Sequence, residues 1–193
     1  MNSQKLMYSK GDNDEMYTPE YAVTAILKHI INFANEFEFI HNRKPTWWCP
    51  FDKENSPFVE WLTVLKQEVV CSHIDRGHDF FEYEPKNWDV IISNHPFTNK
   101  RKIFERALEF NKPFALMTPA TMLNDKYPMC SFVEYGATPQ IINYDNRIIF
   151  EDKHGNRNDK ITFKTIFLCR DFLVLGKGIE FAKVPTIAEQ KKM

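Results

Sequence analysis

The sequence lacks the features that would directly indicate a membrane or secreted protein. No apolar run is longer than a handful of residues, so we expect no transmembrane segment. The first 20 residues contain no apolar core of a secretion signal. The four cysteines show no CxxC spacing and no paired pattern, which disfavours structural zinc and favours buried free thiols in a reducing compartment. We therefore predict a cytoplasmic protein without a structural metal.

Repeats, low-complexity blocks and long linkers are also missing from the 193 residues. With 43% hydrophobic and 15% aromatic residues, the chain can bury a substantial core, which disfavours intrinsic disorder. The polar start, with its GDNDE run, predicts a flexible arm over residues 1–15. We expect a single domain over residues 16–180 and a tail over residues 181–193.

The net charge of −1 excludes a uniformly basic coat for nucleic acid, but it conceals an asymmetry. Residues 1–96 carry 9 basic and 15 acidic side chains, a net of −6, whereas residues 97–193 carry 16 basic and 11 acidic ones, a net of +5. Two interpretations remain open: a basic face built from the second half, or charge scattered over the solvated surface.

Hydrophobic periodicity predicts helices alternating with strands. Thr18 and Pro19 are typical of a helix start, with Thr18 as the N-cap and Pro19 at the first helical position, and helical spacing continues to about residue 36. Three further helices are expected, from Ser56, over 100–110 and over 119–134.

Five apolar runs predict strands: residues 46–50, 68–74, 88–94, 113–117 and 139–144. The run Val90–Ile92 is apolar at three successive positions, which is typical of a strand buried on both faces of a parallel sheet. Two later runs, 147–150 and 161–173, flank a polar loop and predict a hairpin.

Strands that alternate with helices imply βαβ units. The sequence therefore predicts an α/β fold with a doubly wound, mostly parallel sheet and an antiparallel C-terminal strand. Ligands of such sheets bind at the carboxyl ends of the strands. Four segments follow the expected strands and are candidates for the site: Pro50–Asn55, Asp75–Asp79, Ser93–Phe97 and Thr118–Thr121.

A short motif follows the expected strand at 88–94. Its residues Asn94, His95, Pro96 and Phe97 resemble the catalytic tetrapeptide of amino-group methyltransferases, [Asn/Asp]-Pro-Pro-[Tyr/Phe]. The segment 17–19, Tyr-Thr-Pro, is similar to the element that opens the N-terminal helix in many adenine-N6 DNA methyltransferases.

Further elements of that family appear in the same order. Cys49-Pro50-Phe51 falls where those enzymes have Asp-Pro-Phe, and residues 79–81, Asp-Phe-Phe, look like their acidic–apolar element after the third strand. Residues 115–119 look like the fifth strand, and 161–173 like the closing antiparallel strand. The resemblance, which spans residues 14–173, implies a class I methyltransferase fold, which is Rossmann-like. The chain also resembles small stand-alone methyltransferase-like proteins of bacteriophages. For a phage-encoded protein, the expected location is the cytoplasm of the host cell.

The resemblance implies a role for each residue of the tetrapeptide. An exocyclic adenine amine is a weak nucleophile because its lone pair is conjugated with the ring. Asn94 is expected to accept one N–H of the amine and the His95 carbonyl the other, which turns the lone pair toward an electrophilic methyl group. Pro96 restricts His95 to extended backbone. Phe97 is expected to stack on a base that has left its helix.

The resemblance also implies S-adenosylmethionine as the cofactor. We expect an apolar slot for its adenine from Phe51, Phe80 and Phe81, an acceptor for the adenine amine in Asp79, and a carboxylate for the ribose hydroxyls in Asp75. The expected cofactor-binding residues are Tyr17, Thr18, Pro19, Cys49, Phe51, Asp52, Lys53, Asp75, Asp79 and Phe80.

The sequence departs from the family pattern at two places. His95 stands where proline is usual, which keeps a backbone carbonyl but adds a titratable ring. Residues 52–56 contain no glycine where the family has a glycine-rich loop, and Lys53 or the helix start at Ser56 is expected to take over its role.

Basic residues follow the tetrapeptide directly. Lys100, Arg101, Lys102 and Arg106 are expected to contact phosphates on either side of a flipped base. A second contact is expected from Lys153, His154, Arg157 and Lys160. For both groups a solvated surface role is the alternative.

The sequence therefore predicts an S-adenosylmethionine-dependent enzyme that methylates the exocyclic amine of adenine in nucleic acid, with DNA favoured over RNA. Because of the two departures, a catalytically weak or inactive methyltransferase-like protein that binds a nucleic acid or a protein partner remains the alternative. Methylation of RNA or of a protein glutamine is a third interpretation.

Overall fold

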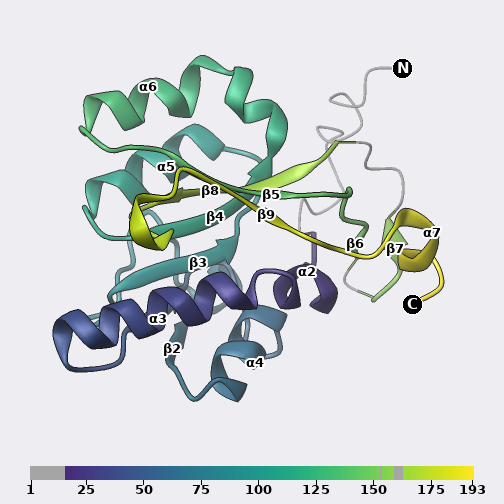
Figure 1. Cartoon of the computed structure of the whole chain (residues 1–193), viewed down its shortest axis with the longest axis horizontal. Coiled ribbons are helices and arrows are strands. Elements are labelled where there is room, and N and C mark those ends of the chain that lie inside the picture. The colour runs from purple at the N-terminus through teal and green to yellow at the C-terminus, as the bar shows by residue number, and fades with distance from the viewer. Residues whose placement is uncertain (1–15, 153, 159–162) are drawn as a thin grey trace.

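The computed structural model describes residues 16–152, 154–158 and 163–193. Its centre is a seven-stranded sheet in the order β2-β1-β3-β4-β8-β5-β9 (Figure 1). The strands of this sheet are β1 (Thr46–Cys49), β2 (Glu68–Cys71), β3 (Val90–Asn94), β4 (Phe114–Pro119), β5 (Gln140–Tyr144), β8 (Thr165–Arg170) and β9 (Ile179–Ala182). Only β8 runs antiparallel to its neighbours, β4 and β5. The expected α/β fold with a mostly parallel sheet and an antiparallel late strand is confirmed at this level.

The side chains of the central strands alternate between two separate hydrophobic cores, one on each face of the sheet. Trp47 and Ile92 pack with helices α2 (Glu20–Thr24), α3 (Leu27–His41) and α4 (Pro57–Val64) on one face. Trp48 and Ile91 pack with α5 (Lys100–Glu109) and α6 (Lys126–Glu134) on the other. Because successive strand side chains point to opposite faces, two consecutive tryptophans can serve two different cores. The result is a three-layer sandwich (Figure 1).

Two expected helices are each divided in the structure. The helix expected from Thr18 to about residue 36 is instead α2 and α3, and Pro19, not Thr18, occupies the N-cap position. The Thr24 hydroxyl donates to Tyr21 O near the break, a side-chain bond that competes with helical hydrogen bonding. The helix expected over 119–134 is a 3₁₀ segment, η2 (Ala120–Asn124), followed by α6. Inside α6, Tyr127 is extended because a proline follows it.

The expected hairpin between 147–150 and 161–173 is wrong. β6 (Phe150–Glu151) pairs instead with β7 (Arg157–Asn158) in a separate two-stranded sheet. β8 enters the main sheet between β4 and β5, where all six of its residues are buried. An apolar strand of this kind is better covered in the middle of a sheet than in an exposed hairpin.

Residues 72–89 are all described and contain no strand beside β2. That segment contains only the 3₁₀ turn η1 (Ile74–Arg76) and further turns, so β2 forms the edge of the sheet. Phe80 is buried against Trp48, with ring centroids 5.5 Å apart, so side-chain packing holds the segment.

The C-terminal residues belong to the domain and do not form the expected tail. β9 pairs in parallel with β5, the 3₁₀ segment η3 (Val174–Gly176) precedes it, and helix α7 (Ile187–Gln190) follows it. Gln190 is fully buried. Its Oε1 accepts bonds from the Tyr21 hydroxyl and from Ile149 N–H, at 2.8 and 3.0 Å. No helix among the described residues has the length and apolar character needed to cross a membrane.

Replacing Gln190 by Ala should lower the free energy of unfolding by about 3 kcal/mol, because buried partners of its amide lose their hydrogen bonds. The exposed neighbour Lys192 provides the control, since its replacement by Ala should change stability by less than about 0.5 kcal/mol. Urea denaturation measures both values. Equal stability of the two variants would mean that residues after 182 do not support the fold.

Candidate active site

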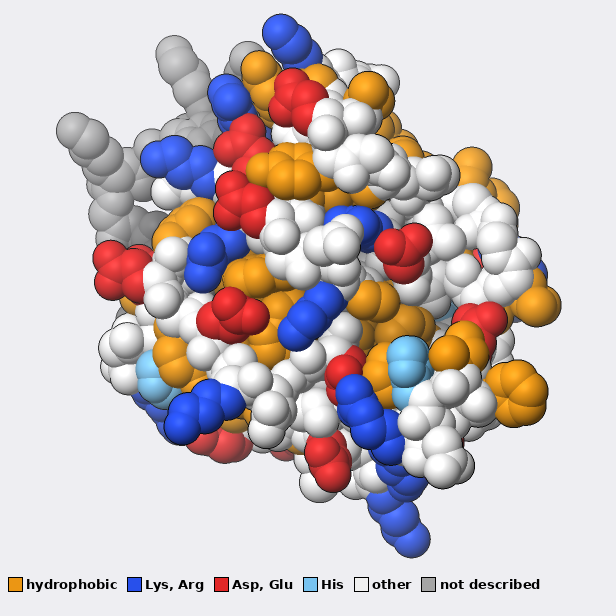
Figure 2. Space-filling model, turned by 90° about the vertical axis from the view of Figure 1, so that its left-hand side faces the viewer, with side chains coloured by type: hydrophobic (Ala, Val, Ile, Leu, Met, Phe, Trp, Pro, Cys, Tyr) orange, Lys and Arg blue, Asp and Glu red, His pale blue; other side chains and the backbone are white. Residues whose placement is uncertain are grey.

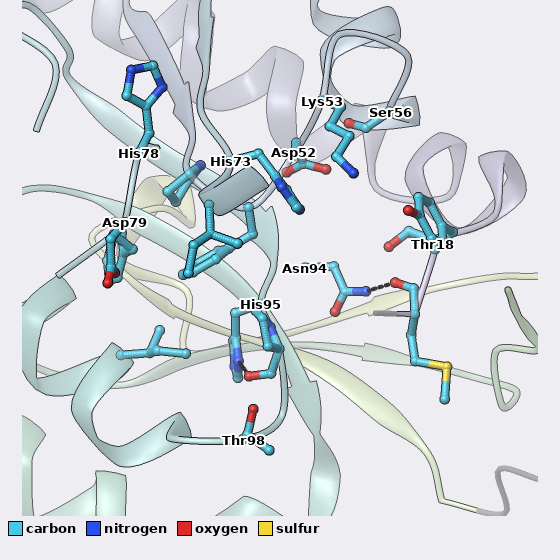
Figure 3. Close-up of a pocket in the computed structure, with 18 of the residues that line it drawn as sticks. Thr18, Asp52, Lys53, Ser56, His73, His78, Asp79, Asn94, His95 and Thr98 are labelled. Carbon is cyan, nitrogen blue, oxygen red and sulfur yellow. Dashed lines mark hydrogen bonds between the residues drawn. The ribbon is translucent and has the colours of Figure 1, made fainter. Parts of the chain in front are cut away.

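A cavity of about 270 Å³ lies at the carboxyl ends of β1, β2 and β3. Three segments after these strands line it together with residues 16–18, and Figure 3 shows Thr18 at one side of the cavity. The fourth expected segment, Thr118–Thr121, does not reach it. The expected site residues that line the cavity are Tyr17, Thr18, Phe51, Asp52, Lys53, Asp79, Phe80, Asn94, His95 and Pro96.

Asn94 is the last residue of β3 and reaches the cavity wall. Its Nδ2 donates to Met16 O at 2.9 Å, a bond drawn in Figure 3. Its Oδ1 is buried and has no hydrogen-bond partner among the described residues. The amide is therefore oriented by its donor end, while its acceptor end is left for a ligand.

His95 follows Asn94 and is 2% exposed. Its Nδ1 lies 2.7 Å from Pro96 O. Because a carbonyl oxygen only accepts, Nδ1 carries the proton and Nε2 carries a lone pair. Burial lowers the pKa of His95 to about 4, so the ring is neutral near pH 7.

Phe97 does not have the expected position. It is 4% exposed, does not line the cavity and packs in the core, with its ring centroid 5.7 Å from that of Phe163. The base-stacking role expected for it is therefore wrong for this arrangement. The side chain points to the apolar layer because that layer offers aromatic partners on the same side of the chain.

Asp52 is a buried carboxylate at the cavity wall. Ser93, which is fully buried on β3, donates its hydroxyl to Asp52 Oδ2. Burial raises the pKa of Asp52 from its usual 3.8 to about 6, although the hydroxyls of Ser93 and Ser56 oppose this rise. The interaction joins the ends of β1 and β3.

Aromatic rings form one wall of the cavity. Phe51 and Phe80 have ring centroids 4.9 Å apart, and Phe81 lines the same wall. Asp79 lies beside them, and its Oδ1 accepts the N–H of Phe81 at 2.9 Å. The expected apolar slot with an adjacent carboxylate is therefore present.

Asp75 is not part of the cavity lining. It lies on the exposed turn η1, where its carboxylate contacts Lys53 Nζ at 2.6 Å and its backbone N–H donates to His73 Nδ1 at 3.1 Å. Lys53 holds the pKa of Asp75 below its usual value. The ribose-binding role expected of Asp75 is therefore wrong for this structure, because β2 ends at Cys71 and the turn carries Asp75 outward.

Two other expected cofactor residues also lie outside the lining. Pro19 is buried at the start of α2, and Cys49 is fully buried in β1, where burial raises the pKa of its thiol well above the usual value. Tyr17 does line the cavity and forms an isolated antiparallel bridge with Glu151 of β6.

The four basic residues after the tetrapeptide have intramolecular contacts, with one exception. Lys100 contacts Asp125 at 2.7 Å, and Arg101 contacts Glu105 at 2.6 Å and lies over the Tyr127 ring. Arg106 donates to Phe80 O at 2.7 Å, which makes it a support of the cavity wall. Lys102 is exposed, and the described residues provide no partner for it.

The second expected phosphate contact is only partly described. Lys153 and Lys160 lie outside the described residues. Arg157 lies 3.8 Å from a carboxylate oxygen of Glu151, and the backbone N–H of His154 is bound by Asp152. Figure 2 shows side chains of both charges interspersed with apolar ones on one face of the molecule, without a continuous basic patch there.

Sequence reasoning gave no role to two histidines of the site. His73 and His78 both line the cavity. The predicted strand ran to residue 74, whereas β2 ends at Cys71, so His73 belongs to the loop at its carboxyl end. The polar pair Ser72-His73 is the signal in the sequence that the strand ends before residue 74, which places His73 in the loop.

A scan of protein-family models finds no family that matches the chain, and a search of curated proteins finds no match either.

The raised pKa of Asp52 has a measurable consequence for stability. The folded protein binds this proton more tightly than the unfolded chain, so the contribution of Asp52 is greatest below about pH 4 and is lost as the pH rises through about 6. The stability of the wild type minus that of Asp52→Asn should therefore fall by about 3 kcal/mol between about pH 4 and pH 7. Buried histidines titrate in both proteins and cancel in this difference.

Denaturation at several pH values measures this difference. Asp75→Asn is the matched control: Lys53 lowers the pKa of Asp75, so its contribution is already largely present above about pH 4 and should not fall between about pH 4 and pH 7. A difference for Asp52→Asn that does not change with pH would contradict the burial of an ionisable carboxylate at this position.

Proposed function

We propose that the protein is an S-adenosylmethionine-dependent methyltransferase that acts on the exocyclic amine of adenine in nucleic acid, with DNA favoured over RNA. The observation that carries this proposal is Asn94. It stands at the carboxyl end of a central strand, lines the cavity and has a buried acceptor atom without a partner among the described residues.

The chemistry of the amine explains why such an acceptor is needed. An amine conjugated with a ring gains nucleophilicity when its N–H bonds point at fixed acceptors, since its lone pair is then directed out of conjugation. Asn94 Oδ1 supplies a fixed acceptor because Met16 O holds the other end of the same amide at 2.9 Å. Such an acceptor also stabilises the positive charge that develops at nitrogen in the transition state.

The cavity residues fit the proposed cofactor. Phe51, Phe80 and Phe81 offer apolar surface for an adenine ring, and Asp79 offers an acceptor for its amine. Lys53 supplies positive charge for a carboxylate. When bound, the cofactor supplies an electrophilic methyl group. After the end of β2, His73 lines the cavity, where Asp75 was expected.

A methyltransferase-like protein without activity is the second candidate. It is favoured by the absence of glycine from residues 52–56 and by the contact of Lys53 with Asp75. The intramolecular contacts of Lys100, Arg101 and Arg106 also leave fewer cations for phosphates, which favours a protein partner. Methyl transfer to RNA or to a protein glutamine would use the same acceptor.

Cofactor binding tests the assignment of the cavity. Replacing Asp79 by Ala should weaken S-adenosylmethionine binding more than about tenfold, since a hydrogen bond to a charged group contributes roughly 1.5–3 kcal/mol. Glu82→Ala is the matched control and should change affinity less than about threefold, because Glu82 is exposed and lies outside the lining. Calorimetry measures both affinities. If the larger loss belongs to Glu82→Ala, the cofactor does not occupy this cavity.

Methyl transfer tests the function itself. Asn94→Ala should lower turnover at least about 100-fold, by analogy with removal of one preorganised hydrogen-bond partner of a transition state, and should leave cofactor affinity nearly unchanged. The assay follows labelled methyl groups from S-adenosylmethionine into single- and double-stranded oligonucleotides, with adenine-free oligonucleotides as the control. Equal transfer by wild type and variant, or transfer to adenine-free strands, would contradict the proposal. Cofactor binding by a wild type that transfers no methyl group would favour the second candidate.

A further inference from the structure

Two adjacent residues at the end of β3 each have a buried acceptor without a partner among the described residues. These atoms are Asn94 Oδ1 and His95 Nε2, and both residues line the same cavity. His78 Nδ1 is a third unpartnered atom of the lining, but its ring stacks on Tyr83 with centroids 4.1 Å apart. Figure 3 shows His78 on the far side of the cavity, while Asn94 and His95 lie next to each other.

The ring of His95 is fixed in one tautomer. Its Nδ1–H donates to Pro96 O at 2.7 Å, so Nε2 can only accept. Burial keeps the ring neutral near pH 7, since it lowers the pKa to about 4. A ligand that bonds to Nε2 must therefore bring a donor.

The ring is also fixed in place. Three phenylalanine rings surround it edge-on, with centroids at 6.3 Å for Phe51, 5.8 Å for Phe97 and 5.4 Å for Phe104. Packing and the bond to Pro96 thus hold Nε2 in one position before any ligand binds, which lowers the entropy lost on binding. A buried acceptor without a donor lowers the stability of the folded protein, and binding sites are places where such unsatisfied atoms are found.

We propose that His95 Nε2 is the second hydrogen-bond acceptor of the target amine, beside Asn94 Oδ1. This inference deepens the proposed function and rests on it for the identity of the amine. A primary amine has two N–H donors, which match two acceptors on adjacent residues. In this arrangement Nε2 replaces the backbone carbonyl of His95 as the second acceptor, whereas proline at this position would offer only that carbonyl.

The two acceptors imply an order of affinity. A primary amine satisfies both atoms, an N-methylamine satisfies one, and an N,N-dimethylamine satisfies neither. Each lost bond should weaken binding by several-fold to about tenfold. The methylated product would therefore bind less tightly than the substrate, which favours its release.

Nuclear magnetic resonance of the wild type with ¹⁵N-labelled histidine is the first test. The probes are short oligothymidines that carry one central adenine, N6-methyladenine or N6,N6-dimethyladenine. Oligonucleotides are used because their flanking nucleotides prevent the base from entering the slot proposed for the adenine of the cofactor, which a free nucleoside could enter. The Nε2 signal of His95 should shift with adenine and should not shift with dimethyladenine at matched saturation. The same shift with both probes, or no shift with either, overturns the inference.

Affinity measurements on a variant are the second test. His95→Phe keeps a flat ring but removes the acceptor, and should reduce the preference for adenine over dimethyladenine by about tenfold. His29→Phe is the matched control. His29 is also buried and has an unpartnered Nε2 and a pKa lowered to about 4, but it lies in a separate small cavity between α3 and β9. An unchanged preference in His95→Phe overturns the inference, and the wild-type resonance test decides the matter if this variant does not fold.

The two proposals fail in different ways. If the wild type transfers methyl groups but its His95 Nε2 signal does not distinguish adenine from dimethyladenine, the inference is wrong and the proposed function stands. If the wild type binds no S-adenosylmethionine but its His95 signal still distinguishes the amines, the proposed function is wrong and the amine contact stands.

Discussion

Burial of β3 on both faces is the constraint on which the rest of the structure depends. Val90, Ile91 and Ile92 are fully buried, with alternating side chains in opposite cores. Neither face can turn toward solvent, so the register of the strand and the point where it leaves the sheet are both determined. Asn94 is that point, and the amide stands where the cores end and the cavity begins. The proposed chemistry therefore depends on packing some distance from the ligand.

A second set of contacts connects distant parts of the chain to this strand end. Met16 O binds the Asn94 amide, while Tyr17 bridges to Glu151 of β6. Tyr21, a few residues later, shares Gln190 with the backbone near β6. The beginning of the described chain, the small β6–β7 sheet and the last helix are thus connected by hydrogen bonds to one side of the cavity.

Local signals predicted much of this arrangement. Sequence reasoning identified the apolar run at 88–94, the Ser56 cap and three of the four segments after the strands, because periodicity, capping and strand ends depend on neighbouring residues. Phe97, Asp75 and the pairing of 161–173 were not predicted correctly, because their positions depend on partners far away in sequence. Phe97 lies against Phe163, and β8 lies between two strands that precede it. The methyltransferase assignment and its cofactor stay predictions from the sequence that the cavity supports.

The position of β2 at the edge of the sheet divides the site into a stiff part and a compliant part. Asn94 and Asp52 stand on or beside strands held by ladder hydrogen bonds to neighbours on both sides. The wall formed by residues 74–83 has short-range backbone–backbone bonds, such as Tyr83 N–H to Asp79 O, and is otherwise held by side chains, through the packing of Phe80 on Trp48 and the bond from Arg106 to Phe80 O. Opening of such a segment breaks side-chain contacts but no ladder hydrogen bonds, whereas distortion of β3 disrupts both cores. The wall can thus adapt to the size of what it holds while the acceptors at the strand end keep their positions.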